Sequence, residues 1–236
     1  MTDYGLLLSM ALTVGLPSLF VRRWPLKTTA GQSLTDVSIS ALGVGLIVGR
    51  IVNLLLDDPR SLTRLGDFLI IRSGVEFWAG AVAGTVVVAR GARRDKVGVA
   101  DRLADVAPAA LVAQAGYHLT CIVRDGCYGP DWAAGPVPKG LMHGMFPVEL
   151  VAAVVLVAVA VRLASRTLHP AIVALGGLSA IAAERSVTSI WLPRLGAGIT
   201  RQHTTSIVIS SVSAVGIVVL YLAQRRREPL PTPCAT

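Results

Sequence analysis

Three ionisable side chains lie inside long apolar stretches. Arg50 interrupts the run GLIVGRIVNLLL, and Glu184 and Arg185 interrupt a second apolar run further along the chain. A charged group in hydrocarbon costs several kcal/mol unless it faces a polar cavity, reaches the interface or pairs with another charge. Arg50 therefore favours a functional site that binds an anion over a structural pair. For Glu184 and Arg185 two interpretations stay open, because the two charges either belong to such a site or neutralise one another.

Histidines and cysteines offer a second kind of chemistry. His118, His143 and His203 lie near the ends of apolar runs, and Cys121 and Cys127 lie between the first two. The spacing CxxxxxC matches no common metal-ligand pattern, and the chain contains no GxSxG, HExxH or Walker sequence. We therefore predict no metal site and no cofactor.

Glycines recur at short intervals in two apolar runs. They are Gly43, Gly45 and Gly49 in one run and Gly74, Gly80 and Gly84 near the next. Such spacing is typical of helices that pack closely through small residues. A second interpretation is that backbone amides near Gly74 and Gly80 bind a phosphate.

Membrane-spanning helices must position these residues. Of the 236 residues, 53% are hydrophobic and only 15% are charged, and the mean hydropathy is +0.64. Runs of roughly 18 apolar residues are long enough to cross a bilayer as helices. The sequence predicts an all-α integral membrane protein, a bundle of about seven transmembrane helices with structured outer loops. The runs are Tyr4–Phe20, Asp36–Leu56, Val75–Ala89, Leu103–Val123, Pro147–Leu163, His169–Ile190 and Thr204–Ala223.

Charge in the short loops predicts the orientation of the bundle. Basic residues follow the first, third, fifth and seventh runs, whereas the alternate loops carry both signs. By the positive-inside rule, the N-terminus lies outside and the C-terminus in the cytoplasm. The net charge of +8 is thus explained by topology, and we expect no nucleic-acid partner. Residues 1–224 form the membrane domain, and residues 225–236 are expected to be a disordered cytoplasmic tail. The first run has no basic stretch before it, so we interpret it as a retained helix.

Several short motifs, taken in order, resemble one family, the prolipoprotein diacylglyceryl transferases of bacterial membranes. The element RSGVEFWAGAVAG (72–84) is similar to the family's Gly-Gly-x-x-Phe-His-Gly-Gly-x-x-Gly signature. The others are Tyr4-Gly5, Gly49-Arg50, LADVAP (103–108), DGCYG (125–129), PVEL (147–150), Glu184 and Gln202. Together they cover nearly the whole chain.

The resemblance implies an activity. In this family, phosphatidylglycerol donates its diacylglyceryl group to the thiol of a lipobox cysteine on a preprolipoprotein, at the outer face of the cell membrane. The expected partners are therefore phosphatidylglycerol or a similar anionic phospholipid, the lipobox peptide and the bilayer. A phosphate leaving group requires arginines or amides around it, and the thiol must lose a proton.

Tyr4, Arg50 and Glu184 stand where the family has functional residues. The other expected site residues are chosen for their chemistry, because an arginine can bind a phosphate and a histidine can accept a proton. The expected catalytic residues are Tyr4, His118 as proton acceptor, and Glu184, which orients an arginine. The expected substrate-binding residues are Arg50, Arg72, Arg185 and Arg201. We expect Arg50, Arg72, His118 and Glu184 to converge on one cavity that opens sideways to lipid.

The chain departs from the family's pattern at three positions. The family's Gly-Arg-Ile-Gly-Asn block falls on residues 116–121, where His118 roughly occupies the place of the arginine. Trp78 stands where the family has a histidine, and Ala180 replaces the arginine of the late Arg-x-x-x-Glu element. An indole cannot exchange a proton at neutral pH. The alternative hypothesis is therefore a non-catalytic lipid-binding or assembly paralogue of the same fold. A transporter or channel would be expected to contain an internal repeat, and the sequence contains none that we can detect.

Overall fold

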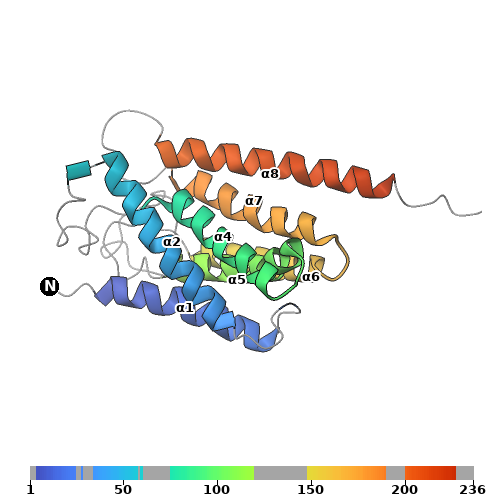
Figure 1. The fold of residues 1–236 in the computed structure, drawn as a ribbon, viewed down its shortest axis with the longest axis horizontal. Coiled ribbons are helices and arrows are strands. Elements are labelled where there is room, and N and C mark those ends of the chain that lie inside the picture. The colour runs from blue at the N-terminus through green and yellow to red at the C-terminus, as the bar shows by residue number, and fades with distance from the viewer. Residues whose placement is uncertain are drawn as a thin grey trace, which may run out of the picture.

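The fold is a bundle of long helices (Figure 1). The computed structural model describes residues 4–24, 28, 34–57, 59–60, 75–119, 148–189 and 200–226, and within them all regular structure is helical. The helices are α1 (Tyr4–Arg23), α2 (Leu34–Asp57), α4 (Phe77–Arg94), α5 (Val99–Leu119), α6 (Val148–Ala164), α7 (Pro170–Thr188) and α8 (Arg201–Arg225). Each overlaps one predicted run. The all-helical prediction is confirmed.

Local sequence signals set the start of two helices that carry the candidate site. His169 precedes α7 and its ring accepts a hydrogen bond from the amide of Ala171 at 3.3 Å, with Pro170 in the first turn. Thr200 precedes α8, and its hydroxyl accepts from the amide of His203 at 3.2 Å. Both caps satisfy amides that have no partner within the helix.

Three of the described helices are long and apolar enough to cross a membrane. They comprise Ile39–Asp57, Pro170–Thr188 and Arg201–Arg225, and a shorter apolar helix spans Val151–Ala164. On α8 the side chains of Val208, Val212, Val215 and Val219 are exposed. In water such an apolar surface would promote aggregation, whereas in a bilayer it contacts acyl chains. The protein is therefore an integral, multi-pass membrane protein.

Helix α5 lies at the centre of the bundle, in contact with α1, α4, α6 and α7. A core cluster of Leu111, Val112 and Ala115 on α5 packs against Val154 and Ala158 on α6. On another face of α5, a Cβ atom added to Gly116 would lie only 2.9 Å from the carbonyl oxygen of Leu12 on α1. Small residues thus allow α5 to be surrounded closely by its neighbours.

Helices α2 and α4 pack through the glycines that the sequence singles out. A Cβ atom on Gly45 would lie 2.9 Å from the Gly80 oxygen, and one on Gly80 would lie 2.7 Å from the Gly45 oxygen. Gly84 faces Ala41 in the same way, at 3.1 Å. The predicted close packing is confirmed for these positions. Gly43 has nothing within 4 Å and takes no part in it.

The two ends of the bundle differ in charge. Described basic side chains gather where α1, α4, α6 and α8 end, at Arg22, Arg23, Arg90, Arg93, Arg94, Arg162, Arg166, Arg225 and Arg226. The opposite end brings together the last turns of α2, α5 and α7 with the first turns of α4 and α8. The sequence assigns the basic end to the cytoplasm, so the second is the predicted outer end.

Two glycines of α4 give a matched test of the α2–α4 contact. Gly80→Ala adds a methyl group against backbone that cannot withdraw without separating the helices, so we expect a destabilisation of about 2 kcal/mol. Gly91 has open space around it, and Gly91→Ala is expected to be neutral or slightly stabilising. Thermal unfolding in detergent measures both variants. Equal midpoints would contradict the account of this contact.

Candidate functional site

The candidate site lies at the predicted outer end, where five helices contribute side chains. The charged and imidazole groups described there include Asp57 on α2, Glu76 before α4, His118 on α5, Glu184 and Arg185 on α7, and Arg201 and His203 on α8. These residues are distant in sequence, so the alternation of helix direction is what brings them to one end. Three polar clusters can be distinguished among them.

The first cluster joins α5 to α7. Atom Nε2 of His118 lies 2.6 Å from Oε1 of Glu184, and both side chains are buried, at 5% and 7% exposed. Gln114, one turn before His118, donates from Nε2 to Oε2 of Glu184 at 3.0 Å and lies 3.1 Å from Nε2 of His118. A ring nitrogen either donates to the carboxylate or accepts from the amide. The three side chains therefore form one buried hydrogen-bonded cluster that joins α5 to α7.

The second cluster holds Arg185. Its guanidinium carbon lies 3.7 Å from the centroid of the Phe77 ring on α4, and its Nη2 donates to Oε1 of Gln202 on α8 at 3.3 Å. Among the described residues, none of the ion pairs includes Arg185. Phe77 and Gln202 thus fix the guanidinium from two sides. The carboxylates of Glu184 and Glu76 are close enough to interact with it electrostatically, but among the described residues neither forms a direct ion pair with it. Such a cation suits an anionic ligand.

The third cluster ties the ends of three helices together. Nη2 of Arg201 donates to Oε2 of Glu76 at 3.1 Å and lies 3.5 Å from Oδ1 of Asp57. The Arg201 side chain is 48% exposed, whereas that of Glu76 is 8% exposed. The backbone amide of Glu76 also donates to the oxygen of Gly49 at 3.0 Å. Arg201 is therefore engaged with two carboxylates, and its positive charge is already compensated.

The remaining predicted residues are placed unevenly. Arg50 lies on α2 directly after Gly49 and is only 4% exposed, so its charge is buried within the bundle and does not face lipid. Tyr4 is the first residue of α1, and the position of its side chain lies outside the described part of the structure, as does all of Arg72. Of the predicted residues, the structure brings His118 and Glu184 into direct contact. Arg185 follows Glu184 on the same helix.

Trp78 has a structural role at the position where the family has a histidine. Its Nε1 donates to Oγ of Ser206 on α8 at 2.9 Å, and that hydroxyl donates to the backbone oxygen of Gln202 at 2.7 Å. Trp78 is buried. The indole thus joins α4 to α8 and exchanges no proton.

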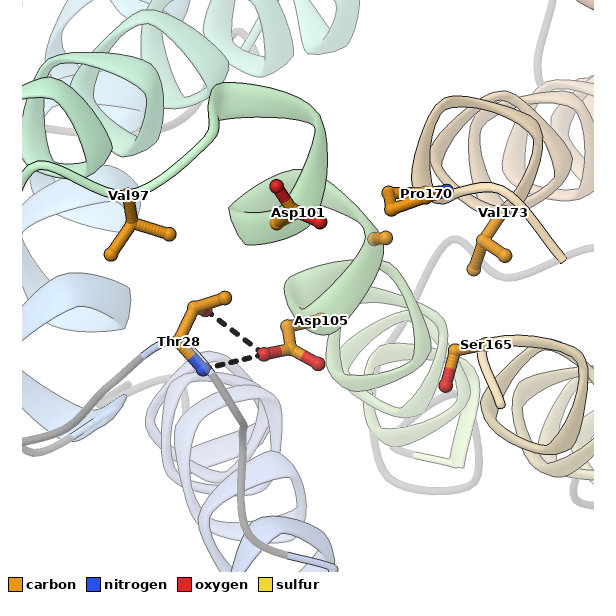
Figure 2. Close-up of a pocket in the computed structure, with 8 residues that line it drawn as sticks. Thr28, Val97, Asp101, Asp105, Ser165, Pro170 and Val173 are labelled. Carbon is orange, nitrogen blue, oxygen red and sulfur yellow. Dashed lines mark hydrogen bonds between the residues drawn. The ribbon is translucent and has the colours of Figure 1, made fainter. Parts of the chain in front are cut away.

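A cavity of about 210 Å³ lies at the opposite end of the bundle, between α5, α6 and α7 (Figure 2). Asp105 on its wall accepts from the amide and hydroxyl of Thr28 at 2.8 and 2.9 Å, and from Arg162 at 3.2 Å. Since the carboxylate is satisfied by protein groups, this region holds helices together. The lateral cavity expected around Arg50, Arg72, His118 and Glu184 includes a residue outside the described ranges and stays a prediction.

Within the described residues, no three histidine, cysteine or acidic side chains come together in a way that could hold an ion. Cys121, Cys127 and His143 lie outside those residues.

The fold and the site define a polytopic membrane protein with arginines and a buried histidine–carboxylate cluster at one end of its helices. A model of the prolipoprotein diacylglyceryl transferase family matches residues 1–227. The chain belongs to this family, as its short motifs indicate. Comparison with curated proteins gives no match.

The first cluster yields a stability prediction. Glu184→Leu removes the carboxylate that Gln114 and His118 share and leaves both buried side chains without this partner. We therefore expect the free energy of unfolding to fall by about 3 kcal/mol. Glu184→Gln retains an amide oxygen and should lose less than half as much. Detergent unfolding measured by tryptophan fluorescence compares the two. A Glu184→Leu variant as stable as the unchanged protein would show that the cluster is not formed.

Proposed function

We propose that this protein transfers the diacylglyceryl group of phosphatidylglycerol to the thiol of a lipobox cysteine on a preprolipoprotein, at the outer face of the cell membrane. Membership of the family and the multi-pass helical bundle support this proposal. The partners are then the phospholipid, the lipobox peptide and the bilayer itself. The cell membrane is the proposed location, with the site facing outward.

One observation carries the proposal, namely the state of Arg185. Its guanidinium is held by Phe77 and Gln202 at the end of an apolar helix, without a carboxylate paired to it among the described residues. A positive charge retained at membrane depth is stabilised by an anion of matching geometry, and a phosphate accepts two parallel hydrogen bonds from one guanidinium. A phospholipid phosphate reaches this depth together with its acyl chains.

The proposed reaction assigns each group a part. Arg185 and Arg50, together with Arg72, bind the phosphate, and Arg201 completes the site by holding α2, α4 and α8 together at that end. The thiolate attacks the glycerol carbon, a carbon–sulfur bond forms, and the carbon–oxygen bond to phosphate breaks. Glycerol phosphate leaves with the electron pair, and the arginines stabilise the charge that develops on it.

The thiol proton needs an acceptor. His118 is the proposed one, because the Glu184 carboxylate 2.6 Å away stabilises the imidazolium that forms. Glu184 also lies directly before Arg185 in α7, so it constrains the backbone that presents the phosphate ligand. Tyr4 is proposed to hydrogen-bond the glycerol or phosphate oxygens.

A second candidate function follows from Trp78 and Ala180. Trp78 is bonded to Ser206 and supplies no base, and Ala180 packs against the core cluster. A paralogue that binds the phospholipid without turnover would fit these two positions. It predicts lipid that co-purifies and depends on Arg185, with no thioether product from any lipobox peptide.

The arginine is tested by transfer and by binding. In nanodiscs with labelled phosphatidylglycerol and a lipobox peptide, Arg185→Gln is expected to reduce thioether formation on the order of 100-fold, because one preorganised charge contact is lost. Arg185→Lys keeps the charge but loses the planar guanidinium, so its rate of thioether formation should lie between those of the unchanged protein and Arg185→Gln. Arg166→Gln, an exposed arginine at the opposite end, serves as the matched control.

The outcomes separate the two functions. A thioether product with unchanged protein and an Arg185-dependent rate supports the transferase. Lipid binding that requires Arg185, without product while an authentic family member works in the same assay, supports the paralogue. Binding and transfer that are indifferent to Arg185 would contradict both.

A further inference from the structure

His203 occupies a place at the site that the proposed reaction leaves unused. It lies in the first turn of α8, and its Nδ1 is 2.8 Å from Oγ of Ser189 at the end of α7. Ser189 is 3% exposed, and its hydroxyl donates to the backbone oxygen of Ser186 at 3.0 Å. The serine is therefore a buried anchor for the ring.

The contact with Ser186 favours one tautomer of the imidazole. A hydroxyl has one proton, and in the bond to Ser186 the Ser189 hydroxyl donates it to the backbone oxygen. With the proton there, the Ser189 oxygen accepts from Nδ1 of His203, and we assign this tautomer to the ring. In the neutral ring, Nε2 is consequently a hydrogen-bond acceptor. His203 itself is partly exposed, and among the described residues no hydrogen bond to Nε2 occurs.

Contacts between α7 and α8 connect His203 to the region of the proposed phosphate ligand, Arg185. Gln202, the residue before His203, accepts from Arg185, while Ser189 lies one turn beyond Arg185 on α7. Gln202 thus contacts Arg185, and His203 contacts Ser189 one turn further along, just after the end of α7. The other charged groups nearby are Glu184 on α7, Arg201 on α8, and the Asp57 and Glu76 carboxylates that bind Arg201.

We propose that Nε2 of His203 accepts a hydrogen bond from a hydroxyl of the phospholipid headgroup, and so selects lipids that carry a hydroxyl beyond the phosphate. The proposal rests on the proposed function, since it takes the phosphate to lie at Arg185. A headgroup hydroxyl lies a few bonds from the phosphorus. His203 follows Gln202, which binds Arg185, so a phosphate at Arg185 would bring this hydroxyl near His203.

The physical basis of the selectivity is an acceptor that needs a donor. When a lipid without a hydroxyl binds, Nε2 loses a partner that water would otherwise supply, and a single neutral hydrogen bond of this kind is worth about a fivefold change in affinity. Phosphatidylmethanol is the matched comparison, because it has the same charge and phosphodiester linkage as phosphatidylglycerol but no headgroup hydroxyl.

The test is a headgroup comparison on full-length protein in detergent. Native mass spectrometry gives the Kd for phosphatidylglycerol and for phosphatidylmethanol. We expect the unchanged protein to prefer phosphatidylglycerol about fivefold, and His203→Leu to bind both lipids equally. His203→Gln, whose amide oxygen can accept, should recover part of the preference. The control His169→Asn alters a histidine at the opposite end while keeping a helix-capping side chain.

A second readout does not depend on the leucine variant folding. ¹⁵N chemical shifts of His203 should report a ring protonated at Nδ1, and Ser189→Ala should shift the ring toward the Nε2-protonated tautomer and weaken the headgroup preference. An Nε2-protonated ring in the unchanged protein would overturn the proposal. So would equal affinity of the unchanged protein for the two lipids, or a full preference in His203→Leu.

The result is separable from the outcome of the transfer assay. A His203-dependent preference without thioether product supports the headgroup contact while rejecting the transferase. Thioether product without a His203-dependent preference supports the transferase and rejects the headgroup contact. Failure of the unchanged protein to bind either lipid overturns both.

Discussion

The organising constraint in this protein is positive charge kept at membrane depth. Arg185 is held by an aromatic face and an amide oxygen, which orient a guanidinium without neutralising it. Arg201 is treated differently, because Glu76 and Asp57 pair with it and it fastens three helix ends. The contrast separates two arginines of one site. Arg201 forms ion pairs with two carboxylates, whereas Arg185 forms no ion pair among the described residues and is the one that we propose binds an anion.

The helices follow from the sequence because apolar length is a strong signal, and each predicted run became one helix. The α2–α4 contact was also predictable, since glycines four residues apart share one face of a helix and permit close approach. Glu184 was singled out as a charge inside an apolar run and by the family resemblance, and His118 as a histidine near the end of such a run. Their direct contact depends on how α5 packs against α7, which one sequence does not encode in any local pattern.

Other parts of the site carried no usable signal. Gln114 is a polar residue in a helix, and only its position four residues before His118 indicates that the two side chains lie on the same face of α5. The bond from Arg201 to Glu76 joins residues 125 apart, and Phe77 was marked by the motif but not by its contact with Arg185. Trp78 is the reverse case, because the motif predicts an acid–base position and the indole instead forms a structural bond to Ser206.

The central claim is that the Arg185 guanidinium contacts a phospholipid phosphate. Solid-state NMR measures this directly, through dipolar coupling between ¹⁵N-labelled arginine and ³¹P of phosphatidylglycerol bilayers, with Arg185→Lys used to assign the signal. The account predicts a coupling corresponding to direct hydrogen bonding that disappears in the variant. A spectrum in which no arginine-to-phosphorus coupling changes upon Arg185→Lys would contradict it.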